Sequence, residues 1–163
     1  MNEIFVIDDI PPWNPEIRSK TILRQASKRV FSDPSLAIAA LGADRDRMLQ
    51  DLSTFGFMFE NLCLRDLAVY AGHYGGSVYH YRDNSELEVD AIIELPNGTW
   101  GAFEIKLGEG QVESAAGTLL RMRDKMLSAG VESPICLAVL TGGGIAQVRE
   151  DGIYVIPITA LRQ

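Results

Sequence analysis

Alternating hydrophobic and polar positions predict three consecutive strands in the middle of the chain. The segments 77–82, 87–95 and 99–107 are rich in β-branched and aromatic residues, and turn-forming residues separate them. After the third segment, apolar residues recur at intervals of three or four positions. This spacing predicts a helix that begins near Val112 and ends at Gly130, a residue suited to a helix C-terminus.

Further segments predict helices before the strands and buried strands after them. A short polar helix is expected at residues 43–52, and Ser53 or Thr54 is expected to cap a longer helix that runs to about Gly72. Two apolar runs near the C-terminus predict buried strands at residues 134–140 and 153–158. The order helix, three strands, helix, strand predicts an α/β sandwich with a mixed sheet flanked by helices.

The turn between the second and third strands sets their register. Pro96-Asn97-Gly98 suits a three-residue hairpin loop, which places Asp90 opposite Glu104 and Glu88 opposite Lys106. All four charged side chains then share one face of the sheet. A two-residue turn would shift the register by one and scatter the charges over both faces, but the proline favours the longer loop.

Opposed carboxylates repel each other unless a cation or a proton compensates them. Asp90, Glu104 and the Ile105 carbonyl could together hold Mg²⁺ or Mn²⁺, and Lys106 could orient a metal-bound water. The chemistry that this pattern indicates is metal-assisted phosphodiester hydrolysis. The alternative is a solvated strand face, on which Glu88 and Lys106 form an ordinary cross-strand ion pair. The residues alone leave both interpretations open.

The same residues carry a resemblance to a known family. The run from Glu88-Val89-Asp90 to Glu104-Ile105-Lys106-Leu107-Gly108 resembles the core motif of the PD-(D/E)XK nuclease superfamily, although Val89 stands where the motif has proline. More narrowly, the chain looks like the domain found at the C-terminus of many prokaryotic AAA+ ATPases, on the following segments: Ser32 to Ala37, Phe59-Glu60-Asn61, and Tyr79 to Arg82. The resemblance implies a restriction-endonuclease-like fold, metal-dependent action on nucleic acid, and an AAA+ ATPase partner.

The resemblance also implies a further acidic ligand on the helix before the sheet, which maps onto Glu60. Phe57, Cys63, Leu64 and Leu67 lie on the same predicted helix face as Glu60. A carboxylate among apolar neighbours needs a partner, which favours a role in the site. The alternative is a surface glutamate near a helix N-terminus, where the macrodipole favours negative charge.

Composition limits the remaining choices. The chain has 163 residues, 47% of them hydrophobic, which suits one domain with a substantial core. We expect an N-terminal arm over residues 1–30, as a remnant of a linker or winged-helix region, and the nuclease-like domain over residues 31–163. No apolar run is long enough to span a bilayer and the N-terminus does not resemble a signal peptide, so we expect a cytoplasmic protein. Cys63 and Cys136 are expected to be core thiols.

Two functions from different classes follow from the sequence. The first is a metal-dependent nuclease, in which Glu60 or Glu88 assists Asp90, Glu104 and Lys106. The second is a nuclease-derived module that binds nucleic acid or protein without cutting. The acidic side chains and Lys106 favour the first, whereas the net charge of −7 and the lack of an ATP-binding motif in the chain favour the second. Basic residues that could touch phosphate cluster in two stretches, Arg18 to Arg29 and Arg121 to Lys125.

Overall fold

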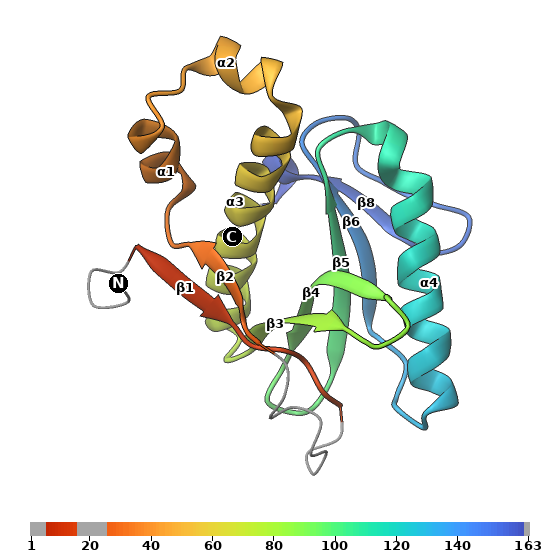
Figure 1. Ribbon diagram of the computed structural model, residues 1–163. Helices are drawn as coiled ribbons and strands as arrows, with labels where there is room; N and C mark the ends of the chain where they lie inside the picture. Colours follow the sequence, from red (N-terminus) through yellow and green to blue (C-terminus); the bar gives the residue numbers. More distant parts are fainter. Residues whose placement is uncertain (1–5, 16–25, 162–163) are drawn as a thin grey trace.

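The computed structural model describes residues 6–15 and 26–161 (Figure 1). The helices are α1 (Pro34–Ala40), α2 (Arg45–Gln50), α3 (Leu52–His73) and α4 (Val112–Ser128), with short 3-10 helices η3 (Glu109–Gln111) and η4 (Ile158–Ala160). The strands are β1 (Ile7–Ile10), β2 (Lys28–Phe31), β3 (Ser77–Arg82), β4 (Glu88–Glu94), β5 (Trp100–Lys106), β6 (Cys136–Thr141), β7 (Gln147–Val148) and β8 (Tyr154–Pro157). The strands and helices predicted from the sequence are therefore present, while β1, β2, β7 and α1 were not predicted.

The larger sheet is mixed, with the strand order β3-β4-β5-β6-β8-β7. The first three strands are antiparallel neighbours, whereas β5, β6 and β8 run parallel to one another. Helix α4 makes the crossover between β5 and β6, which parallel neighbours require. The α/β fold predicted from the order of elements is confirmed.

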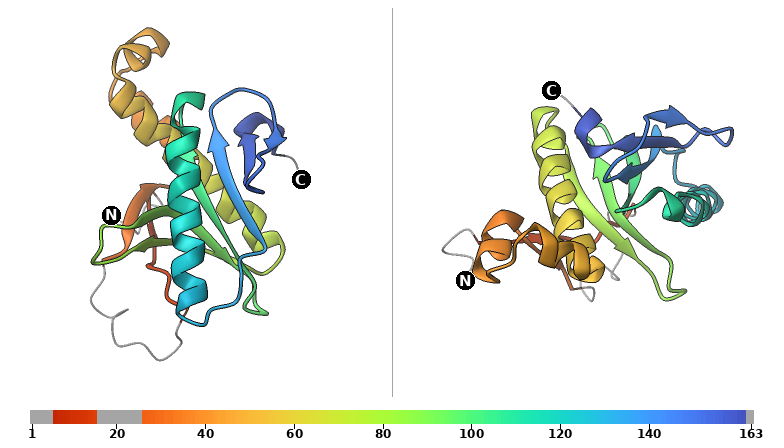
Figure 2. Two further views of the ribbon diagram at one scale, coloured as in Figure 1. Left: turned by 90° about the vertical axis from the view of Figure 1, so that its right-hand side faces the viewer. Right: turned by 90° about the horizontal axis from the view of Figure 1, so that it is seen from above.

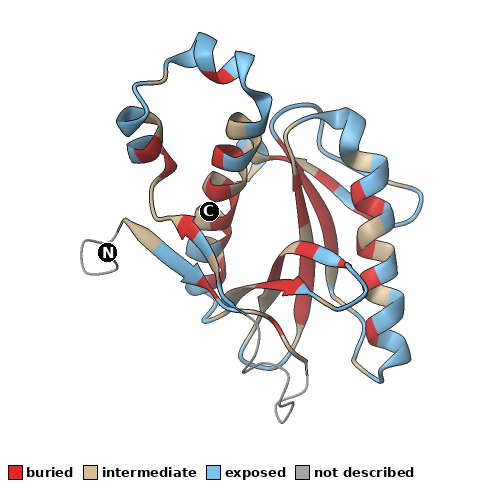
Figure 3. Ribbon diagram, in the orientation of Figure 1, coloured by how far each residue is buried: buried red, intermediate tan, exposed pale blue. Residues whose placement is uncertain are grey.

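Helices α3 and α4 cover opposite faces of this sheet, as the view from above in Figure 2 shows. Each face has its own apolar core, and Figure 3 shows the buried positions running along the central strands and along the inner sides of both helices. The core under α4 includes Val89, Ile92, Trp100, Leu119, Met122 and Val139. The core under α3 includes Cys63, Leu64, Leu67, Ala91, Ile105 and Leu140. Burial of these two layers on a shared sheet holds both helices in place.

The described part of the predicted N-terminal arm is built into the domain. Strands β1 and β2 pair as an antiparallel ribbon, so the predicted boundary between residues 30 and 31 falls inside β2. Trp13 is only 4% exposed, and its ring centroid lies 4.8 Å from that of Trp100. The backbone N–H of Trp13 also donates to the carbonyl of His80 on β3 (2.7 Å). The basic residues Arg18, Lys20 and Arg24 lie outside the described residues.

The two long helices begin and end for local reasons. Asp51 caps α3 by accepting a hydrogen bond from the Thr54 N–H (3.0 Å), so the prediction of Ser53 or Thr54 as the cap is wrong by two or three residues. Gly130, with a φ of +82°, follows α4 as predicted, and Val131 N–H reaches the Met126 carbonyl (3.0 Å). None of the helices in the described residues has the length and apolar character needed to cross a bilayer.

Candidate functional site

The β4–β5 hairpin has the register that the sequence predicts. Ala91 pairs with Phe103 and Glu94 with Trp100, and the Leu95 N–H donates to the Thr99 carbonyl (2.9 Å). The loop between these strands is Pro96-Asn97-Gly98, and Gly98 has the left-handed φ of +83° that favours glycine. The start of β4 therefore lies beside the end of β5. Asp90 and Glu104 are the next residues beyond the Ala91–Phe103 pair.

Asp90, Glu104 and Lys106 form one cluster of charges at the end of β5. The Lys106 Nζ lies 3.0 Å from Asp90 Oδ2 and 2.6 Å from Glu104 Oε2. The side chain of Glu104 is 5% exposed, that of Asp90 15% and that of Lys106 25%. The backbone N–H of Ile105 donates to Asp90 Oδ2 (2.8 Å), which fixes this carboxylate from a second direction. A solvated strand face would not bury Glu104 and leave Asp90 and Lys106 only partly exposed, so the cluster is a charge network largely removed from water.

Burial and mutual repulsion make Glu104 a weak acid. Removal from water and the negative charge of Asp90 raise the pKa of Glu104 to about 7, although the Lys106 ammonium acts in the opposite direction. Burial works against the charged form of Lys106, but the two carboxylates outweigh it and raise the pKa of Lys106 above its usual range. Near neutral pH, the cluster therefore holds a proton that Glu104 can gain or lose.

A β-bulge in β4 explains the position of Asp90 and corrects the position of Glu88. Between Tyr79 and Tyr81 of β3 the pairing advances by two residues, while β4 advances by three, from Ile92 to Val89. An extra residue bends a strand and re-aims its side chains. Asp90 lies at this bulge, and its carboxylate accepts a hydrogen bond from the Ile105 N–H.

Glu88 lies beyond the bulge and outside the cluster. In the strand register Glu88 lies opposite Arg82 of β3, and it lines a separate hollow with Lys28 and His80. Lys106 instead forms its ion pairs with Asp90 and Glu104. The prediction of Glu88 opposite Lys106 on the face of the cluster is therefore wrong, because a regular register was extended past a bulge that the sequence does not reveal.

Glu60 reaches the edge of the same site from α3. It lines a hollow of about 490 Å³ together with Lys106, Gly108 and Gln111. Its carboxylate forms an ion pair with Lys28 of β2, and both side chains are 22% exposed. A carboxylate on an apolar helix face was expected to need a charged or polar partner, and Lys28 is that partner. Sequence reasoning did not identify Lys28 as the partner, since no spacing rule links residues on separate elements.

The donor set suits a hard divalent cation with several of its waters retained. Mg²⁺ is commonly bound by one or two carboxylates, with water or phosphate oxygens completing its shell. Asp90 and Glu104 supply two such carboxylates side by side. Within residues 6–15 and 26–161, however, no three His, Cys, Asp or Glu side chains are close enough to hold a metal ion together. The roles of Glu60 and of the Ile105 carbonyl as metal ligands therefore stay predictions.

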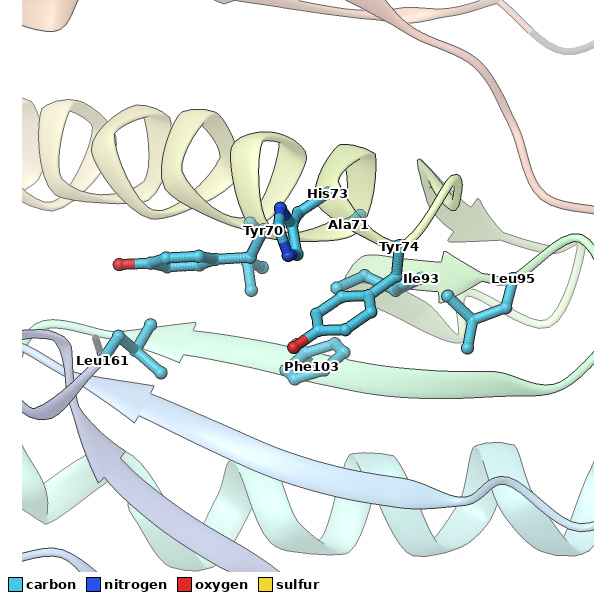
Figure 4. A pocket seen from close by; sticks show the side chains of 9 residues that line it. Tyr70, Ala71, His73, Tyr74, Ile93, Leu95, Phe103 and Leu161 are labelled. Atoms are coloured by element: carbon cyan, nitrogen blue, oxygen red, sulfur yellow. The ribbon is translucent and has the colours of Figure 1, made fainter. Parts of the chain in front are cut away.

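A second hollow lies near the other end of α3 and has different chemistry. It measures about 350 Å³ (Figure 4). Its walls come from the end of α3 with the residue that follows it, from the sheet with the residue after β4, and from the C-terminal segment: Tyr70, His73, Tyr74, Ile93, Leu95, Phe103 and Leu161. The Tyr74 ring lies beside that of Phe103 in this view. Its walls are mostly apolar and carry none of the acidic side chains of the charged cluster.

The remaining sequence candidates have structural roles. Cys63 is fully buried, and burial followed by the charges of Asp66, Glu60 and Asp90 raises the pKa of its thiol to about 12, so it is a core thiol as predicted. Cys136 is half-buried on β6. In the exposed glycine-rich loop after β6, a Cβ on Gly142 would lie 2.8 Å from the Leu107 carbonyl oxygen, whereas Gly143 has open space around it.

One protein family matches the chain. Its description is "Domain of unknown function (DUF4143)", and the match covers residues 55–161, more than half of the chain. The matched residues include Glu60, Asp90, Glu104 and Lys106, whereas Lys28 precedes them. No curated protein and no solved structure shows significant similarity to the chain.

Proposed function

The chain belongs to the DUF4143 family, and we propose that its Asp90–Glu104–Lys106 cluster hydrolyses phosphodiester bonds of nucleic acid with the help of a divalent cation. The observation that carries this proposal is the Lys106 Nζ between the buried carboxylate of Glu104 and the partly exposed carboxylate of Asp90, beside a hollow. Burying two acids around one lysine costs folding free energy, and such costly charge networks concentrate at functional sites. The resemblance of the same residues to the PD-(D/E)XK motif supports the choice of reaction.

Each residue has a distinct part in the proposed reaction. Asp90 and Glu104 would bind Mg²⁺ or Mn²⁺, and the Ile105 N–H holds the Asp90 carboxylate in position. A cation bound there would lower the pKa of a water and offset charge on the phosphate. Lys106 would give up its contacts with the carboxylates, turn toward the hollow that it already lines, and donate to the attacked phosphate or to the nucleophilic water.

The proposal extends to the partner of the domain. The chain carries no ATP-binding motif, and its resemblance to domains at the C-terminus of AAA+ ATPases supports a role beside such an ATPase. A net charge of −7 is unfavourable for holding a polyanion without help. A partner that brings nucleic acid to the hollow would supply the missing attraction.

A second candidate function is a nuclease-fold module that binds nucleic acid or protein without cutting. The observation in its favour is that Lys106 compensates Asp90 and Glu104 without any metal, while the described residues offer no group of three metal-ligating side chains. Such a module would keep the charge network as a structural feature and would gain nothing from a divalent cation.

Thermal unfolding with EDTA, Mg²⁺ or Mn²⁺ separates these functions. We expect Mn²⁺ at a hundredfold excess over its dissociation constant to stabilise the native chain by about 2.7 kcal/mol. Asp90→Asn should lose this response, because it removes a ligand charge but keeps the shape of the side chain. Asp124→Asn is the matched control, since Asp124 is an exposed acid on α4.

Cleavage assays on single-stranded, duplex and branched DNA and on RNA follow if the response depends on Asp90. A native chain that ignores both metals, or an Asp90→Asn variant that responds as the native chain does, would refute the metal-dependent function. The non-cutting module would then be the better account.

A further inference from the structure

The hollow at the end of α3 is a pocket whose walls come from three parts of the fold. The last turn of α3 forms one wall, and the neighbouring strands β4 and β5 form another. Leu161, which follows η4, supplies the third. Figure 4 shows side chains of the helix on one side and those of Phe103 and Leu161 on the other, all bordering the same space. Its volume of about 350 Å³ lies at the lower end of the range for small-molecule pockets.

The packing of the chain around this pocket keeps it open without a ligand. Ala71 lies one helical turn after Leu67, and both line the pocket and are 3% exposed. The short side chain of Ala71 leaves room between the helix and the sheet. Directly after α3, a Cβ on Gly76 would lie 2.8 Å from the Leu95 Cδ2 atom, so the backbone of this turn packs onto the end of β4. A pocket held in this way does not have to be ordered by its ligand.

The lining favours an uncharged ligand. None of the described residues that line the pocket has a carboxylate, ammonium or guanidinium group. A charged ligand would therefore lose its hydration without gaining an ion pair from such a group. The polar groups of the lining are the hydroxyls of Tyr70 and Tyr74 and the imidazole of His73, which can donate or accept hydrogen bonds. A neutral molecule with one hydrogen-bonding group matches this combination.

Aromatic rings form much of the wall. The Tyr74 ring lies beside that of Phe103 in Figure 4, and Tyr74 is 72% exposed. The His73 ring stands at 90° to the Tyr74 ring, with 5.0 Å between the two centroids. Tyr70 adds a further ring from the same turn of α3. Pairs of aromatic rings attract each other beyond the effect of the area that they bury, so a planar aromatic ligand gains more here than a saturated ligand of the same shape.

We propose that this pocket binds a small, uncharged molecule that consists of one or two planar aromatic rings with a hydrogen-bonding substituent. The ring system inserts between the end of α3 and β5, against Tyr74 and Phe103. The substituent meets the Tyr70 hydroxyl or the His73 imidazole. No residue of the charged cluster lines this pocket, and binding needs no metal. The inference therefore stands or falls separately from the proposed nuclease function.

Titration of the full chain in EDTA with three matched probes tests the class of ligand. Benzyl alcohol is neutral and aromatic, cyclohexylmethanol is its saturated counterpart, and benzoate is its charged counterpart. We expect benzyl alcohol to bind about fivefold more tightly than cyclohexylmethanol and more tightly than benzoate. Equal binding of the two alcohols would overturn the aromatic class, and tighter binding of benzoate would overturn the uncharged class. No binding of benzyl alcohol would overturn the site.

Methyl NMR spectra recorded during the same titration locate the bound probe. The ring current of benzyl alcohol should shift the methyl signals of Ile93, Leu95 and Leu161, which line the pocket. The methyl signals of Leu36 and Leu49, which are exposed on α1 and α2, should stay in place. Equal shifts of both sets would show unspecific association with apolar surface and would overturn the site.

Substitutions test the contribution of the rings. Tyr74→Ser removes an exposed ring and should weaken binding of benzyl alcohol about fivefold. Tyr154→Ser is the matched control, because Tyr154 is 44% exposed on β8 and does not line the pocket. Phe103→Leu keeps an apolar side chain and should reduce the preference for benzyl alcohol over cyclohexylmethanol. Equal effects of Tyr74→Ser and Tyr154→Ser, or an unchanged preference in Phe103→Leu, would overturn the role of the rings. Melting curves confirm that each variant is folded.

Discussion

Replacement of Glu104 by glutamine should stabilise the protein at alkaline pH in the absence of metal. Glu104 has a pKa of about 7 in the folded protein instead of 4.5, chiefly because it is buried and secondly because Asp90 is negative. Each pKa unit corresponds to about 1.4 kcal/mol, so ionised Glu104 costs roughly 3 kcal/mol of folding free energy. Glutamine keeps the shape of the side chain and cannot ionise.

The direction with pH follows from proton uptake. Between pH 4.5 and 7 the folded chain holds the Glu104 proton more tightly than the unfolded chain does, so the contribution of Glu104 to stability is lost as pH rises through about 7. Burial lowers the pKa of His80, which acts in the opposite direction, because stability from a neutral buried histidine is lost as pH falls. The difference between Glu104→Gln and the native chain removes the His80 contribution.

Urea unfolding in EDTA at pH 5, 6.5 and 8.5 measures this difference. The difference in the free energy of unfolding, in favour of Glu104→Gln, should be about 1 kcal/mol at the lowest pH and rise to about 3 kcal/mol at the highest, with equal slopes in urea. Glu150→Gln, at an exposed position, is the matched control. Native and Glu104→Gln curves that run parallel with pH would refute the account of Glu104 as a buried, repelled carboxyl.

Two further substitutions test how the N-terminal ribbon is attached. Trp13→Ala should lower the free energy of unfolding by about 3–5 kcal/mol, because Trp13 is 4% exposed and its ring packs against that of Trp100. A loss under about 1 kcal/mol in urea unfolding would contradict this packing. Asn61→Ala should lower the free energy of unfolding by about 1–3 kcal/mol in the same assay. The buried Asn61 amide accepts a hydrogen bond from the Phe31 N–H and donates one to the Phe57 carbonyl (2.7 Å each). An unchanged free energy of unfolding would show that water replaces both hydrogen bonds.

Local sequence signals predicted the central hairpin and its charges well. Pro96-Asn97-Gly98 specified the turn, and the turn specified which residues face each other, because the side-chain period of a strand is two. Short-range patterns therefore brought Asp90, Glu104 and Lys106 to the same end of the hairpin, although the bulge sets where Asp90 points. The helix ending at Gly130 and the buried strand near Val139 followed equally from such patterns.

Features that depend on distant contacts were not predictable in the same way. The bulge at Asp90 depends on how β4 meets β3, and it moved Glu88 out of the cluster. Trp13 follows prolines that indicate an irregular arm, yet it packs onto Trp100, 87 residues further along the chain. The partner of Glu60 likewise comes from a strand that the sequence did not predict. Tertiary packing decided each of these points.

The packing of Trp13 also bears on what counts as one folding unit here. The family match begins at residue 55, after β1 and β2 and well beyond Trp13. A chain cut at that position would leave the rings of Tyr81 and Trp100 without the ring that covers them, and the free edge of β3 without its backbone contact to Pro11 and Trp13. An uncovered strand edge beside exposed aromatic rings invites self-association. The folding unit of this protein therefore extends beyond the part of the chain that matches the family, and we expect a chain that begins at residue 55 to self-associate.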